Sequence, residues 1–284
     1  MHSADKTSQP SNLKSSILQG LVKLPPMPQI ILKVRETMAN PNAGLRDVVR
    51  IIEKDQALVA RVLALANSAY YGLSGKVSSI QHASVLLGLN TLGDLIAMSA
   101  AAVLLTRELA GYRLDPQTLW KHSLSSAICS REIALRRFPG TEADAFVVGL
   151  LHDAGKIILD PYLCNRKDPL AVPGAVTETQ EIEWLGVDHA EIMALACRFW
   201  RFPEAQVRGI RYHHHPSQSA QSALAYVAHL GHGLSQRAGL GAAANETAVT
   251  EDGTLEFLKF QPNDLDDLQN YMIQEMKRLE ETLR

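Results

Sequence analysis

The sequence is poor in the features that mark several classes of protein. It has only three cysteines, Cys129, Cys164 and Cys197, which cannot form a disulfide framework, so we expect a reduced, cytoplasmic chain. Lysine plus arginine (28) nearly balances aspartate plus glutamate (30), and this argues against broad binding of nucleic acid. The first 22 residues also lack the apolar core of a secretory signal.

Long apolar segments are lacking as well. The most apolar window, residues 95–105, is well short of the ~20 residues that span a bilayer, so we expect a buried helix there and no membrane partner. Hydrophobic residues nevertheless make up 46% of the chain and charged residues 20%. This balance is typical of a folded globular protein and argues against global disorder.

Alternating apolar and polar runs, the mark of strands, are missing, and the apolar residues recur at helical spacing instead. Asp115, followed by proline, predicts the start of one helix. Thr141 with Asp144 predicts a capping box before a second helix, and Asp188 predicts the N-cap of a third. We therefore predict an all-α fold.

The C-terminal residues 265–283 carry apolar side chains at steps of three and four, which predicts an amphipathic helix. Packing of its apolar stripe against its own domain is the favoured interpretation. A coiled coil between two copies is the less favoured alternative, because the stripe is short for that purpose. A homodimer therefore stays open.

Histidine is the residue with an unusual count, ten in all. The pair His152-Asp153 could bring an imidazole and a carboxylate to one cation from adjacent positions. Taken singly, each candidate histidine is more simply explained as a core residue with a backbone hydrogen bond. Together, on successive helices of a bundle, they favour a metal site. The other candidates are His122, His189, His213, His214, His215, His229 and His232.

The order of a single histidine, the His-Asp pair and the later histidines resembles the HD superfamily of metal-dependent phosphohydrolases. The N-terminal half narrows the resemblance to the HDOD domain, over roughly residues 20–235. The segments that resemble the HDOD signature are residues 24–28, 52–58, 66–72, 79–83 and 86–90.

The resemblance implies an N-terminal helical subdomain followed by an HD-like helical bundle. We place the first over residues 20–113 and the second, metal-binding one over residues 114–237. A polar leader over residues 1–19 would precede them, and a loop with the amphipathic helix would follow over residues 238–284.

The resemblance also implies a set of metal ligands. His122, His152 and Asp153 would be the primary ligands, and His189, His213 and His214 would add a second position. His232 stands where the family usually has its final aspartate, although the nearby His229 could take that place instead.

One carboxylate, Asp153, is too little negative charge to hold two divalent ions easily, so we expect one ion, with two as the alternative. Imidazole ligands suit Fe, Mn, Ni or Zn better than Mg or Ca.

Two functions follow from the resemblance. The first, which we favour, is a signal-transduction or regulatory module that acts through a signalling protein partner. The second is an active metal-dependent phosphohydrolase for a phosphodiester or nucleotide, in which Asp153 and Lys156 serve catalysis. Lys156 would otherwise be a solvated cation at a helix end, which is the simpler interpretation of that residue.

Overall fold

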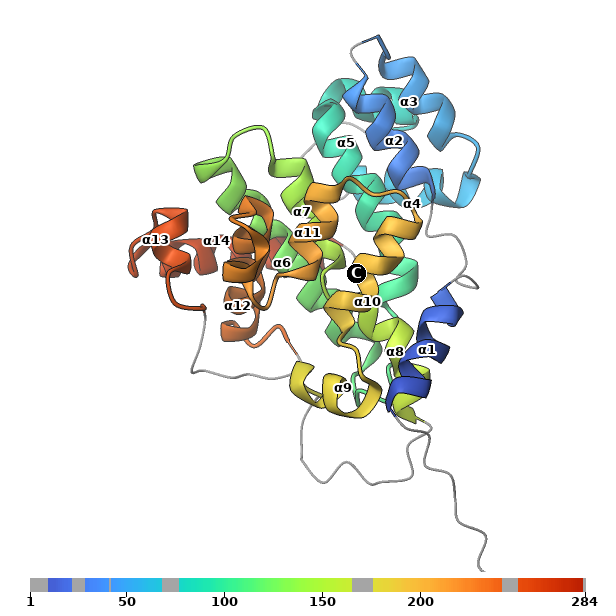
Figure 1. Ribbon diagram of the computed structural model, residues 1–284. Helices are drawn as coiled ribbons and strands as arrows, with labels where there is room; N and C mark the ends of the chain where they lie inside the picture. The colour runs from blue at the N-terminus through green and yellow to red at the C-terminus, as the bar shows by residue number, and fades with distance from the viewer. Residues whose placement is uncertain are drawn as a thin grey trace, which may run out of the picture.

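The computed structural model describes residues 10–21, 29–40, 42–67, 77–164, 176–241 and 250–282, and these are helical almost throughout (Figure 1). The extended pairing within these ranges is a single antiparallel bridge between Leu109 and Leu114. The predicted all-α class is therefore confirmed. Of the HDOD-like segments, residues 24–28 and the 68–72 part of the 66–72 segment lie outside the described residues.

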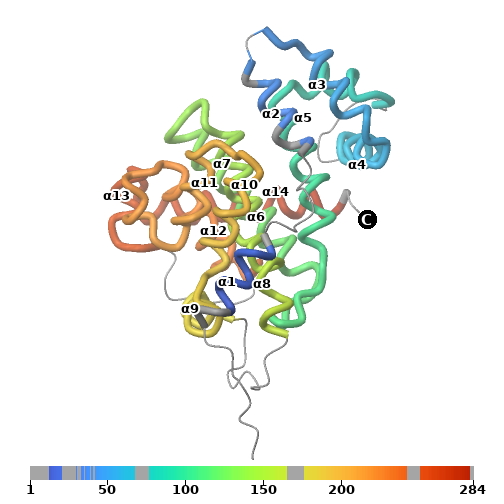
Figure 2. Tube along the Cα trace, turned by 45° about the vertical axis from the view of Figure 1, so that its right-hand side comes forward, coloured from blue at the N-terminus to red at the C-terminus, as the bar shows by residue number. Residues whose placement is uncertain are grey.

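Four helices form a group at one end of the molecule, and Figures 1 and 2 both show it standing apart from the rest. They are α2 (Gln29–Ala39), α3 (Leu45–Ile52), α4 (Gln56–Ala66) and the first part of α5 (Ile80–Leu105). Asn67 closes the end of α4, since its side chain donates to the carbonyl of Val77 and accepts from the Val77 backbone N–H. The second part of α5 runs from this group into the larger bundle, so α5 joins the two halves.

Helix α5 bends at Gly88, whose φ of 80° and ψ of 164° are not helical. Glycine has no β-carbon to oppose a positive φ, so the chain turns here at little steric cost. Among the described helices, α5 is the one long and apolar enough to cross a membrane by length and composition. Half of its apolar window is buried inside the protein, as we expect for a core helix interrupted at Gly88.

The larger bundle is built around α6 (Pro116–Arg137), which packs against α7 (Glu142–Leu151), α12 (Ala223–Arg237) and α14 (Asp264–Thr282). Small residues allow these helices to approach closely. A β-carbon on Gly149 would lie 2.7 Å from the Ala127 α-carbon, and one on Gly231 would lie 2.5 Å from the Ser130 hydroxyl oxygen. The bundle is completed by α8 (Gly155–Cys164), α9 (Glu178–Leu185), α10 (His189–Phe199), α11 (Glu204–Arg211), the 3₁₀ helix η2 (Pro216–Ser219) and α13 (Thr254–Leu258).

Two sequence expectations differ from the structure. Residues 10–19 of the expected polar leader belong to a helix, α1 (Pro10–Leu21), because Ile17 is apolar and fully buried. Thr141 is the N-cap of α7, but the predicted capping box is wrong. Its hydroxyl donates backwards to the carbonyl of Phe138, so the side chain caps nothing in α7.

The C-terminal helix α14 packs on its own bundle, as favoured from the sequence. Leu268, Met272, Met276 and Leu279 are buried against the core. The boundary that we placed at residues 113–114 stays a prediction, because α5 contacts helices on both sides of it.

Candidate metal centre

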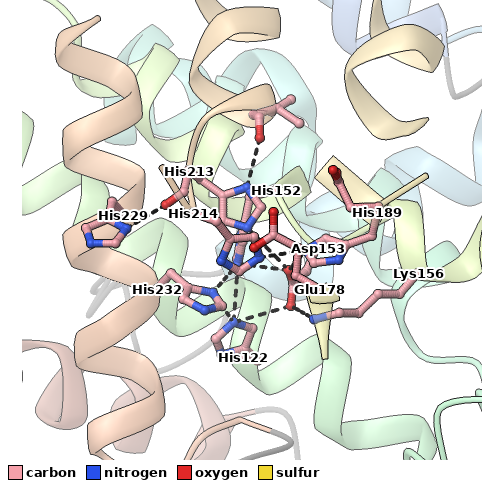
Figure 3. Close-up of polar contacts among 12 residues, drawn as sticks. His122, His152, Asp153, Lys156, Glu178, His189, His213, His214, His229 and His232 are labelled. Atoms are coloured by element: carbon pink, nitrogen blue, oxygen red, sulfur yellow. Dashed lines mark hydrogen bonds and ion pairs between the residues drawn. The ribbon is translucent and has the colours of Figure 1, made fainter. Parts of the chain in front are cut away.

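All seven predicted ligands meet in one place (Figure 3). They come from α6, the turn between α7 and α8, the first residue of α10, the turn after α11, and α12. Their ligand atoms form two groups that share Asp153, and within each group all ligand atoms lie within 4.8 Å of one another. The first group is His122, His152, Asp153 and His232; the second is Asp153, His189, His213 and His214.

In the first group, three imidazole nitrogens converge. His122 Nε2 lies 3.2 Å from His152 Nε2 and 3.0 Å from His232 Nδ1, and the last two nitrogens are 2.9 Å apart. His152 Nδ1 lies 2.7 Å from the carbonyl oxygen of Gly149, so Nδ1 carries the proton and Nε2 presents a lone pair to the centre. Three lone pairs cannot all be satisfied by hydrogen bonds among the three nitrogens, whereas a cation at about 2.0–2.1 Å from each nitrogen would satisfy them all.

The second group contains a buried nitrogen with no hydrogen-bond partner. His213 Nδ1 donates to the carbonyl of Ile210 at 2.8 Å, which leaves Nε2 as an acceptor facing the cluster without a donor. His189 Nε2 lies 3.0 Å from both Asp153 Oδ1 and His214 Nε2. Buried acceptors of this kind are costly unless a cation or a donor meets them, so the donor set fits a metal ion.

A buried carboxylate that the sequence did not reveal holds His189 in place. Glu181 Oε2 lies 2.7 Å from both the His189 ring Nδ1 and the His189 backbone nitrogen. The hydroxyl of Tyr112 donates to the other oxygen of Glu181 at 2.7 Å. A carboxylate behind a ligating imidazole fixes the ring and raises its basicity, a common support of metal-binding histidines. Glutamate eight residues before a histidine gives no recognisable sequence signal.

Lys156 forms an ion pair with Asp153, and its side chain is 12% exposed, which differs from a solvated cation at a helix end. Burial alone would raise the pKa of Asp153. The positive charge of Lys156 and contacts with His152 and His189 outweigh burial and hold the pKa of Asp153 well below its usual range. Asp153 therefore stays an anion, in spite of being almost fully buried.

Burial sets the protonation of the imidazoles. It lowers the pKa of His122 to about 4 and lowers the pKa of His152, His214 and His232 well below the usual value, so these rings are neutral near pH 7. His189 behaves differently. Burial would lower its pKa too, but the negative charges of Glu181 and Asp153 prevail and raise it to about 9.

The structure distinguishes the two histidines on α12. His232 lies in the cluster, whereas His229 faces away from it. His229 Nδ1 donates to the carbonyl of His213 at 2.7 Å, and its Nε2 accepts from the backbone N–H of Glu251 at 2.7 Å. His229 thus ties the His213 backbone to the segment before α13. His215 is half-exposed and pairs with Glu178 at 3.3 Å, apart from the cluster.

These observations define an all-α protein with a buried His/Asp cluster whose donor set suits a metal ion. Six of the seven ligand side chains are buried, and His214 is partly buried. The HDOD domain profile matches residues 24–216, so the chain belongs to the HDOD domain family.

Solved structures share the fold. An HDOD domain protein with unknown function from Geobacter sulfurreducens is 22% identical, with 98% of this chain and 99% of that chain covered and a TM-score of 0.75. A Shewanella amazonensis protein named "Putative phosphohydrolase" is 25% identical, with 95% and 98% covered and a TM-score of 0.70.

An uncharacterized protein from Treponema pallidum (strain Nichols) is 28% identical over 217 residues. The match takes in 73% of this chain and 40% of the relative, so the present chain spans less than half of the relative's length.

Proposed function

We propose that the chain is an HDOD regulatory module whose helical bundle is organised around a buried divalent transition metal, and that its output is contact with a signalling protein partner. The observation that carries this proposal is the burial of the cluster. His122, His152, Asp153, His189, His213 and His232 are each between 0% and 6% exposed. Structural metal sites are closed in this way, whereas catalytic sites keep a ligand position open to substrate.

One ion, held by His122, His152, Asp153 and His232, fits the charges best. These three imidazoles have lowered pKa values, so they offer lone pairs near pH 7 without first losing a proton. In the second group, the pKa of His189 is raised because its ring lies between the carboxylates of Glu181 and Asp153. A metal ion would therefore have to displace a proton from this ring. A second ion is therefore at a disadvantage. The imidazole-rich donor set favours Fe, Mn, Ni or Zn.

The partner-binding surface would lie away from this site. Beside the bend of α5, the side chains of Val85, Leu86 and Leu89 are 69%, 47% and 36% exposed. Apolar side chains gathered on a surface mark sites of protein contact more often than scattered ones do. This supports a protein partner at the N-terminal subdomain.

A metal-dependent phosphohydrolase acting on a phosphodiester or nucleotide is the second candidate. It is favoured by the ion pair between Lys156 and Asp153, which places a cation next to the ligand group, and by the name of the Shewanella amazonensis protein. The ion, when bound, would polarise a phosphoester as a Lewis acid. Lys156 would then steady a phosphate oxygen, provided that the bundle opened to admit the substrate.

The two functions are separated by Asp153→Ala, with the exposed Asp252→Ala as the matched control. We expect the wild type to purify with at most one equivalent of transition metal and to turn over nothing in a panel of phosphodiesters and nucleotides. Asp153→Ala should lose the metal, lose about 1–3 kcal/mol of unfolding free energy and keep its partner. Elemental analysis, thermal melts and turnover assays make the comparison.

Two results would contradict the proposal. One is the absence of metal after reconstitution with Fe, Mn, Ni and Zn. The other is metal-dependent turnover by the wild type that disappears in folded Asp153→Ala, which would establish the hydrolase instead.

A further inference from the structure

A polar cavity of about 460 Å³ lies over α10, α11 and η2, formed by residues outside the metal cluster. Its volume is in the range of small-molecule sites, about 300–1,000 Å³. Three arginines and one tyrosine give the cavity its chemical character. The lining includes Arg198, Arg208, Arg211, Tyr212, Glu191 and Ala220.

The three arginines differ in how far their charges are already satisfied. Arg198 forms an exposed ion pair with Glu204 at 2.7 Å. Arg211 lies 3.3 Å from Asp188 and 3.5 Å from Glu191. Arg208 is half-buried, and its side chain makes one long hydrogen bond, 3.5 Å to the carbonyl oxygen of Ser219. A guanidinium group has five N–H donors, so Arg208 has most of its capacity left for a ligand.

The backbone beside Arg208 has an unusual conformation. Ala220, at the end of η2, has a φ of 52°, and Gln221 follows with a φ of 61°. Non-glycine residues in this conformation are strained, and such strain is concentrated at ligand sites.

We propose that this cavity binds a phosphate-bearing small molecule of nucleotide size. Arg208 is the main phosphate contact, because planar guanidinium groups bind phosphate through two parallel hydrogen bonds. Arg198 and Arg211 line the cavity as well, with their charges already paired with carboxylates. Tyr212 lines the cavity, with the Arg211 guanidinium 5.6 Å from its ring centroid, and supplies the aromatic side chain against which a base can pack.

The cavity is connected to the metal cluster through Arg211. Arg211 reaches Asp188, whose side chain caps α10 immediately before His189, and Arg211 itself precedes His213 by two residues. A phosphate that draws Arg211 towards the cavity would shift both segments. Bound in this way, the molecule would be the signal to which the module responds, and this assignment rests on the proposed function. Its binding needs neither metal nor partner.

The test is titration calorimetry of the full chain, metal-free and metal-loaded, with ADP, GDP and inorganic pyrophosphate. We expect the nucleotides to bind more tightly than pyrophosphate in both forms. Arg208→Ala should weaken nucleotide binding at least about tenfold, in line with the loss of a hydrogen bond to a charged group. Arg208→Lys keeps the charge but not the planar guanidinium group, so its nucleotide affinity should lie between those of the wild type and Arg208→Ala. Arg136→Ala, which removes an arginine paired with Glu132 on α6, is the matched control and should bind like the wild type.

Absence of binding for all three probes would overturn the proposal, as would unchanged affinity in folded Arg208→Ala. Pyrophosphate binding as tightly as the nucleotides would overturn the role of Tyr212 and the nucleotide assignment. Because elemental analysis reports the metal separately, failure of the metal-site proposal is distinguished from failure of nucleotide binding.

Discussion

Glu181 is a buried residue that orients one of the two donor groups without belonging to it. It is fully buried, accepts from Tyr112, and is bound to both the ring and the backbone nitrogen of His189. Its negative charge makes His189 a stronger base, and its two hydrogen bonds fix the ring towards Asp153. The carboxylate therefore acts on the second donor group and not on the first.

In titrations with metal in excess, we expect Glu181→Gln to weaken binding of a second ion at that group about 10- to 100-fold, because a neutral amide keeps the shape of the side chain but loses its charge. Binding at His122, His152 and His232 should change little. Metal titration of the folded variant measures both effects. Glu178→Gln, which alters the carboxylate paired with the half-exposed His215, is the control, and an equal loss in both variants would contradict the positioning role.

His232 invites a second test at this scale. Because its Nδ1 lies about as close to His122 as to His152, His232→Asp would place a carboxylate between two imidazoles and add negative charge to the cluster. We expect this variant to bind more metal per chain than the wild type. Elemental analysis gives the stoichiometry. His229→Asp, at the neighbouring position outside the cluster, should not raise it, and unchanged stoichiometry in His232→Asp would argue against His232 as a ligand.

The sequence could supply the histidines of the cluster but not their supports. His-Asp adjacency and the order of the histidines are visible in the chain, and the resemblance to the HDOD domain singled out the seven candidates among them. Whether His229 or His232 faces inward was not, since the two are three residues apart on one helix and differ only in what surrounds them. Glu181 and Tyr112 were missed because a buried acid far from its partner in sequence looks like any surface acid.

At the scale of elements, the position of α8 against α10 depends on Gly155. A β-carbon there would overlap the backbone carbonyl oxygen of His189, the first residue of α10. Gly155 is thus needed for the close approach of two backbones next to the cluster. It keeps Asp153 and His189 within 3.0 Å of each other.

We therefore expect Gly155→Ala to lower the free energy of unfolding by about 1–3 kcal/mol, the usual cost of overpacking, and to weaken metal binding as Asp153, which both donor groups share, is displaced. Chemical denaturation and metal titration test the two effects. Gly44→Ala is the control, because a β-carbon at Gly44 meets nothing within 4 Å. Equal stability of the two variants would show that α8 and α10 adjust without cost.

Helix starts were predictable where a cap is local, and not where it is overridden. Asp188 caps α10 as predicted, because its side chain needs only the nearby N–H of Glu191. Thr141 failed as a capping box because the carbonyl of Phe138 was a competing acceptor for its hydroxyl. The bend of α5 at Gly88 was not predicted either, since one glycine in an apolar run gives no warning that the helix is divided there.

For the whole molecule, the cluster makes stability depend on pH in two opposite ways. His122, with a folded pKa of about 4 against about 6.5 unfolded, contributes stability that is fully present above pH 6.5 and is lost as the pH falls towards 4. His152, His214 and His232 act in the same direction. The raised pKa of His189, about 9, gives stability that is present below pH 6.5 and is lost as the pH rises through 9.

The metal-free chain should therefore be most stable near pH 6.5, and bound metal should reshape this profile. A divalent ion stabilises the folded state in proportion to its concentration over its dissociation constant, so a chelator should lower the melting temperature most at neutral pH. At acid pH the effect should shrink, because protons compete for the imidazoles. Equal melting temperatures with and without chelator at pH 7 would argue against a structural ion.

The alkaline side of the same profile reports how many ions are held. With one ion at His122, His152, Asp153 and His232, Glu181 still holds His189 Nδ1 and raises the pKa of His189, so the metal-loaded chain should still lose stability as the pH rises above about 6.5. An ion in the second group would require a deprotonated nitrogen on His189, and this loss would then disappear. We expect the loss of stability to remain in melts of the metal-loaded wild type. It should disappear in Glu181→Gln, where a neutral amide replaces the carboxylate that raises the pKa of His189. A flat alkaline profile in the metal-loaded wild type would mean that both donor groups are filled.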